Sequence, residues 1–286
     1  MTQAELVKAL IDAGIHFGNP ASRWNPRMEP YIQGKRGNVH IINIKETVKG
    51  LMLAKKLIQN TVAGGKDVLF VGTKRQARNA VEEEARRCGM HYVSARWLGG
   101  TLTNFRTIRD RLKRLEQLEK LFETGEIENY SKKIKSTMNR EMVKIKANLE
   151  GIRKMDKLPG VIFLVDTKRE HIAVNEARKL GVKTVALIDT DGNPNDIDLP
   201  IPGNDDAMRA INLIVSQLAD AAIEGKNGRT TGTGDRPAEG ENRRRSARSA
   251  FKAGDGEQPA TGDQPEAAPA ADAPAAEQPA TEQPAA

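Results

Sequence analysis

The chain has 286 residues, enough for one large domain or two ordinary ones, and its formal net charge is +7 at pH 7. Its single cysteine, Cys88, excludes an internal disulfide framework and an all-cysteine metal site. No run approaches about 18 uninterrupted apolar residues, as a transmembrane helix would require. The first residues also lack the basic and apolar segments of a secretory signal, so we expect a cytoplasmic protein.

The charge is unevenly distributed along the chain. Residues 1–226 carry a net charge of +10, whereas residues 227–286 carry −3 and are rich in alanine, proline and glutamate. We therefore divide the chain into a body, 1–226, and a tail, 227–286, which buries too little apolar surface to order itself. The body's charge favours a phosphate polymer or an anionic membrane as partner. The run Arg243-Arg244-Arg245 fits either an RNA contact or a solvated tail.

The body starts with a helix predicted over residues 4–13 and ended by Gly14. Residues 17–38 combine prolines, aromatics and basic residues, which predicts a long functional loop without regular structure of its own. A regular alternation follows, with strands expected at 39–44, 68–71, 92–93, 161–165 and 184–188, and helices at 45–62, 73–87, 169–180 and 205–223. Short apolar strands between amphipathic helices predict an α/β fold, a parallel sheet covered by helices on both faces.

Residues 105–157 interrupt this alternation. They contain neither a proline nor a strand pattern, and apolar residues recur every three or four positions, as at Ile108, Leu112 and Leu115 and again at Ile145 and Leu149. Each helix has only a narrow apolar stripe, which predicts an inserted antiparallel coiled-coil hairpin. The segment carries a net charge of +6. Ion pairs on a solvated helix surface would account for balanced charges but not for this surplus of basic residues. The narrow stripe argues against a membrane-surface protein, which would need a broad apolar face.

The main alternative to a binding protein is an α/β enzyme. The segment Gly72-Thr73-Lys74-Arg75 follows a strand and opens a helix, an arrangement that suits a phosphorylated metabolite. However, the chain has no Walker loop, no dinucleotide-binding glycine fingerprint, no nucleophile elbow and no zinc-protease motif. We therefore predict that the protein is not an enzyme and has no cofactor.

A few ligand-type side chains are expected near the carboxyl edge of the sheet. Asp189 follows a strand, Asp205 starts a helix, and His16 could reach the same edge, so these three are candidate ligands for a divalent ion. Aspartates are also common in turns and as helix caps, and we favour that interpretation. Our prediction is therefore that no metal is bound.

Basic and aromatic residues recur together in three segments that the fold should bring close to one another. Arginine forks onto phosphate oxygens and tryptophan stacks on exposed bases, so the pattern predicts RNA binding. For the tryptophans themselves, we favour anchoring of the loops over base stacking. The candidate RNA-binding residues are Arg23, Trp24, Arg27, Lys35, Arg36, Lys74, Arg75, Arg78, Arg96, Asn104, Arg106 and Arg109.

Six ordered blocks within about residues 5–225 carry a resemblance to a known family. They include Ile11-Asp12-Ala13-Gly14-Ile15-His16-Phe17-Gly18, Arg23-Trp24-Asn25-Pro26, Arg96-Trp97-Leu98-Gly99-Gly100-Thr101-Leu102-Thr103-Asn104 and Ile201-Pro202-Gly203-Asn204-Asp205-Asp206-Ala207. In these blocks the chain resembles the S-two family of bacterial small-subunit ribosomal proteins. The resemblance implies a flavodoxin-like sheet with a protruding coiled coil and no catalysis. It also implies contact with small-subunit ribosomal RNA and with neighbouring ribosomal proteins, including docking of the mRNA-binding protein S-one.

Overall fold

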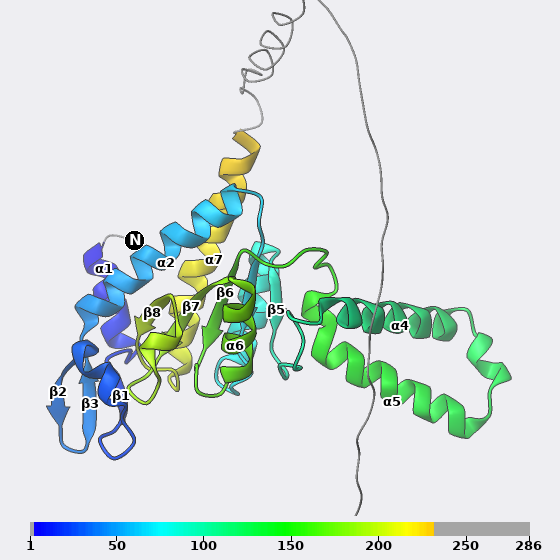
Figure 1. Cartoon of the computed structure of the whole chain (residues 1–286), viewed down its shortest axis with the longest axis horizontal. Helices are drawn as coiled ribbons and strands as arrows, with labels where there is room; N and C mark the ends of the chain where they lie inside the picture. Colours follow the sequence, from blue (N-terminus) through cyan, green and yellow to red (C-terminus); the bar gives the residue numbers. More distant parts are fainter. Residues whose placement is uncertain (1–2, 232–286) are drawn as a thin grey trace, which may run out of the picture. The chain divides into compact units, whose positions relative to one another are not determined.

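The computed structural model describes residues 3–231, which form two β-sheets and the helices around them (Figure 1). The last helix, α7 (Met208–Thr231), continues past the end predicted for it and takes in the first five residues assigned to the tail. The remainder of the predicted tail, from residue 232 on, lies outside the described residues.

The larger sheet has five parallel strands in the order β5-β4-β6-β7-β8. In chain order they are β4 (Val68–Val71), β5 (His91–Val93), β6 (Val161–Val165), β7 (Lys183–Ile188) and β8 (Leu199–Pro202). Every residue of β4 and β6 is buried, because helices cover both faces of a parallel sheet. The predicted α/β class is confirmed, and the strand order fits a flavodoxin-like fold.

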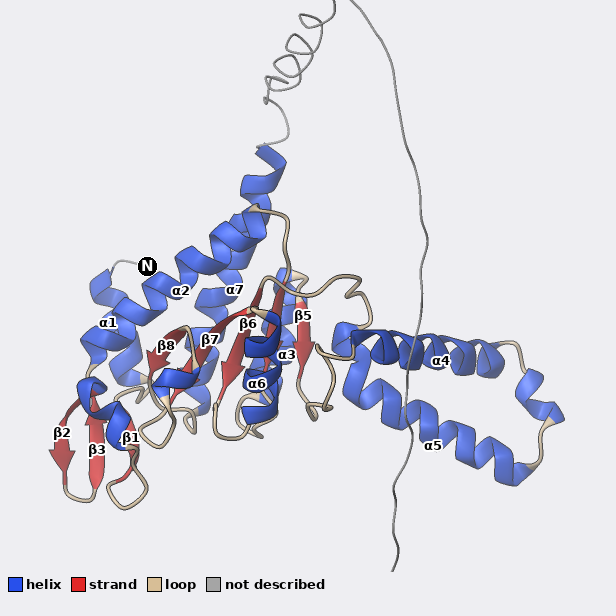
Figure 2. Ribbon diagram, viewed as in Figure 1, coloured by secondary structure: helices blue, strands red, loops and turns tan. Residues whose placement is uncertain are grey.

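Alternate residues of each strand supply two separate cores. Phe70 and Phe163 pair in register and belong to the core formed with α1 (Gln3–Asp12), α2 (Ile44–Ala63), α3 (Arg78–Cys88) and α7. Their neighbours Leu69 and Ile162 belong to the core formed with α6 (His171–Leu180) and with the loop and helices that follow β5. The two-residue period of a strand thus assigns each side chain to a face. Figure 2 shows the helices that lie against the strands of this sheet.

Residues 17–42 differ from the prediction. They form a three-stranded antiparallel sheet, β1-β3-β2, from β1 (Phe17–Pro20), β2 (Ile32–Arg36) and β3 (Val39–Ile42), with the 3₁₀ helix η1 (Pro26–Tyr31) between β1 and β2. The prediction of a loop without regular structure was wrong. The strand predicted at residues 39–44 was expected to belong to the parallel sheet, but β3 pairs with β1 and β2 instead. Gly37, with φ +61°, makes the tight turn that joins β2 to β3.

Strand β8 has no counterpart in the sequence-based prediction. It contains Pro200 and Pro202, and proline cannot donate a hydrogen bond to a neighbouring strand. The strand is tolerated because it lies at the edge of the sheet and pairs with β7 alone.

The segment between β5 and β6 is helical, with α4 (Phe105–Glu123) and α5 (Lys132–Leu149) in contact with each other. Two 3₁₀ turns follow the helices, η2 (Glu126–Asn129) after α4 and η3 (Glu150–Ile152) after α5. The predicted apolar stripe is buried at Leu112 and Leu115 of α4 and at Ile145 of α5. Both helices join the core beneath α6, which anchors this segment to the sheet.

Candidate nucleic-acid interface

The carboxyl edge of the parallel sheet is the place where such folds bind ligands, at the point where the strand order reverses. Here that point lies between β4 and β6, and the protein's own side chains fill it. Glu170, just before α6, accepts hydrogen bonds from the Thr73 hydroxyl and from the Thr73 amide, the latter at 3.2 Å. Arg169 Nε donates to the same hydroxyl at 3.0 Å. Thr73, which belongs to the segment that the alternative enzyme interpretation relied on, is therefore already engaged by the protein's own side chains.

Lys74, the next residue, is engaged in the same way. Its ammonium lies 2.7 Å from Asp205 Oδ1, 2.6 Å from Asp206 Oδ1 and 3.7 Å from Asp166 Oδ2. Burial alone would lower the pKa of Lys74, but the hydrogen bonds to Asp205 and Asp206 outweigh it and raise the pKa. The positive charge of Lys74 is thus used inside the protein, and a phosphate would have to displace three carboxylates to reach it.

Asp166 supports this arrangement through an unusual backbone conformation. It is the one non-glycine residue with positive φ in the described part of the chain, at +68°. Its Oδ1 accepts hydrogen bonds from the amides of Lys168 and Arg169, both at 3.1 Å, an aspartate turn that stabilises the left-handed conformation. The turn brings Arg169 and Glu170 to Thr73, two residues after the end of β4.

The candidate metal ligands are only partly brought together. Asp189 and Asp205 meet, with Asp206 as the third member, and one oxygen from each lies within 4.8 Å of the others. His16 does not belong to this group. Lys74 pairs with Asp205 and Asp206, and Asp189 accepts two backbone amides, so the protein's own groups engage all three carboxylates. The predicted cap before α7 is supplied by Asn204, whose Oδ1 accepts the amides of Asp206 and Ala207. Elemental analysis after incubation with zinc or magnesium tests whether these carboxylates hold a divalent ion instead. A protein that carries no ion after this incubation contradicts the metal site.

Asp189 is a buried carboxyl group at the end of β7, and its Oδ1 accepts the amides of Asn19, at 3.2 Å, and Thr190. Burial raises the pKa of Asp189 from 3.8 to about 6. Between these pH values the folded protein holds a proton that the unfolded chain has lost, so this group lowers the free energy of unfolding as pH rises through the window.

Replacing Asp189 by asparagine is therefore expected to raise the free energy of unfolding by roughly 2–3 kcal/mol above about pH 6. Asparagine cannot ionise, and its Oδ1 can accept the same two amides. Urea unfolding at about pH 4 and about pH 7 checks this. We expect near-equal stability at the lower pH and a more stable variant at the higher pH. A variant less stable than the wild type at both pH values contradicts the account.

Glu176 of α6 organises the loop between β5 and α4, and the sequence assigned it no role. Its Oε1 accepts hydrogen bonds from Trp97 Nε1 at 3.1 Å and from the Gly100 amide at 2.7 Å. Its Oε2 accepts from the Leu102 amide at 2.9 Å and from the Thr103 amide and hydroxyl at 3.1 and 3.2 Å. Burial alone would raise the pKa of Glu176, but these donors hold the pKa below its ordinary value.

The two tryptophans differ in their surroundings, and Trp97 anchors its loop, as the sequence favoured. Trp97 is buried, with 6% of its surface exposed, and its ring N–H is taken by Glu176. Trp24 is half-buried, and its ring lies 5.0 Å from that of His40 on β3. The amide of Asn25 donates to the carbonyl of Thr190 at 2.8 Å, which ties the segment around Trp24 to the carboxyl end of β7.

Most of the predicted cations are exposed. Within residues 3–231, seven of them form neither an ion pair nor a side-chain hydrogen bond: Arg23, Arg27, Lys35, Arg36, Arg75, Arg96 and Arg106. We call these seven residues the basic edge. Arg75 follows β4, Arg96 follows β5, and Arg106 lies in the first turn of α4. The other four lie in the segment from β1 to β3, which is tied to the end of β7 through Asn25 and Thr190.

The other predicted contact residues have partners inside the protein. Arg78 donates to the carbonyls of Ser94 and Ala95, at 2.9 and 3.4 Å. Arg109 binds the carbonyl of Met155 at 3.1 Å and the carboxylate of Asp156 at 2.8 Å. The Asn104 side chain accepts a hydrogen bond from Thr107 at 2.9 Å. These three residues, like Lys74, have structural roles, which spacing along the sequence does not reveal.

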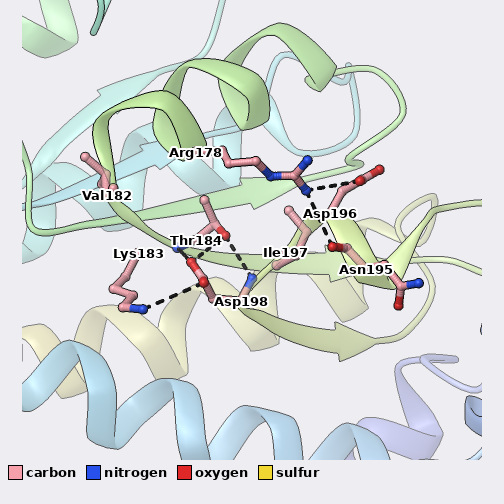
Figure 3. A pocket seen from close by; sticks show the side chains of 9 residues that line it. Arg178, Val182, Lys183, Thr184, Asn195, Asp196, Ile197 and Asp198 are labelled. Atoms are coloured by element: carbon pink, nitrogen blue, oxygen red, sulfur yellow. Dashed lines mark hydrogen bonds and ion pairs between the residues drawn. The ribbon is translucent and has the colours of Figure 1, made fainter.

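A small polar cavity of about 170 Å³ lies between the end of α6 and the segment before β8 (Figure 3). Its charged groups are paired with one another, Arg178 with Asp196 at 3.1 Å and Lys183 with Asp198 at 3.8 Å. Asp198 also accepts from the amide and hydroxyl of Thr184. The cavity therefore offers a ligand no unpaired charge.

None of the helices within residues 3–231 has the length and apolar character needed to cross a membrane.

Comparison with known proteins gives consistent matches. A family model described as ribosomal protein S2 matches residues 10–225. The small ribosomal subunit protein uS2 of Rhodopirellula baltica is 58% identical over 222 residues, covering 78% of this chain and 85% of the relative. The uS2 proteins of Geotalea uraniireducens and Lawsonia intracellularis are 49% and 51% identical over 223 and 220 residues. These matches cover 78% and 77% of this chain, and 87% and 76% of the relatives.

Proposed function

The chain belongs to the ribosomal protein S2 family, and we propose that it fulfils its structural role in the small ribosomal subunit by binding the subunit's RNA through the basic edge. Members of this family are structural, non-enzymatic components of the ribosome. The observation that carries the proposal is the contrast between two sets of charges. Lys74 and Arg109 are held by the protein's own carboxylates, whereas the basic edge is exposed and unpaired within residues 3–231.

The basic edge suits phosphate contacts. Arginine presents a planar fork that matches phosphate oxygens, and most of these seven residues are arginines. RNA is favoured over a small phosphorylated metabolite because Glu170 and Lys74 fill the ligand position of the fold. The field of a body with a net charge of +10 adds attraction at longer range.

Salt dependence tests RNA binding by the full-length protein. With 6–10 phosphate contacts, the affinity for purified small-subunit RNA is expected to fall roughly 10³–10⁵-fold between about 50 and 200 mM salt, because each contact releases condensed counterions. Filter binding or fluorescence titration over this range measures the slope. An affinity that stays the same over this range of salt concentration contradicts the RNA proposal.

The architecture we propose for this role has two parts. The body, residues 1–226, supplies the basic edge, and residues 105–157 form an antiparallel coiled-coil hairpin inserted between β5 and β6. Contact between α4 and α5 and the burial of Leu112, Leu115 and Ile145 support the hairpin. The predicted tail, residues 227–286, carries a net charge of −3, and this proposal gives it no part in the basic edge.

The family membership also supports a place for the protein among its neighbours. We propose that it acts in the cytoplasm as part of the ribosome, contacts other small-subunit proteins and helps to dock the mRNA-binding protein S-one. Small subunits depleted of this protein should then retain less S-one after sedimentation, and adding the purified chain back should restore it. Equal retention with and without the chain contradicts the docking role.

A further inference from the structure

A groove of about 720 Å³ lies between the first turns of α4 and residues 137–149 of α5, the two neighbouring helices in Figure 2. We propose that this groove takes an unpaired nucleotide of the ribosomal RNA, with its base on the apolar floor and its phosphates on the cationic rim. The inference rests on the RNA binding proposed above and adds a site that the sequence did not single out.

The floor of the groove is apolar and fixed. It is lined by Leu98, Ile108, Ile145 and Leu149. The last three are buried and belong to the core that anchors both helices to the sheet, so the floor exists without a ligand. A base presents a flat face that stacks or packs on such a surface without a sequence-specific hydrogen bond.

The rim of the groove is cationic. Arg111, Arg140 and Lys144 line it, are exposed, and form no ion pair within residues 3–231. The one carboxylate in the lining, that of Glu141, lies 3.7 Å from Arg114 Nε and is thereby compensated. Arg140 and Lys144 are about one helical turn apart on the same side of α5. The rim therefore offers three positive charges that the protein does not neutralise.

The charge along α5 favours a nucleic acid over an acidic peptide. The helix carries six basic residues and one acidic residue, so the excess extends well beyond the groove. A polymer with a negative charge on every unit complements such a helix along its whole length. A peptide would have to be acidic at nearly every position and would still lack the flat apolar face that fits the floor.

The first test removes the rim charges. A triple variant, Arg111→Gln, Arg140→Gln and Lys144→Gln, is compared with a control of equal net charge, Lys113→Gln, Lys120→Gln and Lys132→Gln, whose cations lie on the same helices outside the groove. Binding is measured to purified small-subunit RNA at several salt concentrations. The slope of log affinity against log salt should become shallower by about 2–3 in the triple variant, because each lost phosphate contact reduces its magnitude by about 0.7–0.9. The control should stay close to the wild type.

The second test fills the groove without changing the charge. Thr137 lines the groove, is exposed, and its hydroxyl bonds only the carbonyl of Lys133 in its own helix, so Thr137→Trp leaves the core intact. Acylation of RNA 2′-hydroxyls reports unpaired nucleotides. Thr137→Trp should abolish the change in reactivity that the wild type causes at the nucleotide held in the groove, and it should leave the changes caused by the basic edge in place.

The outcomes separate this inference from the proposed function. A wild type with a flat salt response contradicts RNA binding altogether. If the wild type binds with the expected slope but the triple variant matches its control and Thr137→Trp matches the wild type, the groove proposal alone is overturned. Variants that bind RNA normally but are lost from assembled subunits indicate a protein segment in the groove, which also overturns it.

Discussion

Replacing Glu176 by alanine is expected to lower the free energy of unfolding by roughly 3–5 kcal/mol, since breaking a buried hydrogen-bonded network has costs of this size. The carboxylate accepts five hydrogen bonds from the loop between β5 and α4. Its removal leaves the Trp97 N–H and the amides of Gly100, Leu102 and Thr103 without their acceptor. Urea unfolding at neutral pH measures the effect.

Two comparisons make this prediction specific. Glu83→Ala removes an exposed carboxylate of α3 and should change stability by less than about 0.5 kcal/mol. Because the pKa of Glu176 is lowered, its carboxylate stabilises the fold above its ordinary pKa of 4.5, and this contribution is lost as pH falls below that value. The difference between wild type and Glu176→Ala should therefore shrink in acid. A difference that is small at neutral pH contradicts the anchoring role.

The second large effect is expected in RNA affinity. The quadruple variant Arg23→Gln, Arg27→Gln, Lys35→Gln and Arg36→Gln removes four exposed cations from one segment of the basic edge. If all four contact phosphates, the salt slope should fall by about 3–4, and affinity for small-subunit RNA should fall roughly 10³-fold at about 100 mM salt. Titration of the purified RNA at several salt concentrations measures both quantities.

A control of equal net charge distinguishes local contacts from the general field of the protein. Lys8→Gln, Lys45→Gln, Lys56→Gln and Lys179→Gln remove four exposed cations from α1, α2 and α6. We expect this control to retain most of the affinity and slope, because its cations lie outside the basic edge and removing them weakens only the long-range field. Equal losses in the two quadruple variants would show that only net charge matters.

The parallel sheet was predictable because its signals are local. Strands β4 and β6 are continuous apolar runs, and Gly89 and Gly181, both with positive φ, end α3 and α6 where the sequence placed the helix ends. The β1–β3 sheet was missed because β2 is largely polar, with Lys35 and Arg36 at its end, and because Pro26 and Pro30 lie within η1, so the segment lacks the apolar alternation of a strand. The pairing of β1 with β3, as of Phe17 with Ile41, also joins residues that are well separated in the sequence.

The candidate interface was predictable in composition but not in detail. Lys74 and Arg75 are adjacent and chemically alike, yet Lys74 meets Asp205 while Arg75 remains exposed. The carboxylate that engages Lys74 lies 131 residues further along the chain, so only the folded sheet reveals the difference. Glu176 was missed for the same reason, since its donors lie 73–79 residues away and it appears in the sequence as an ordinary helical glutamate.

Sedimentation of an extract from cells that make the protein tests its structural role in the small subunit most directly. At high magnesium the chain should move with whole ribosomes, and at low magnesium, where the subunits separate, it should follow the small subunit alone. Raising the salt concentration should release it, because phosphate contacts weaken with salt. A chain found only in the soluble pool, with no fraction on the small subunit at either magnesium concentration, contradicts the account.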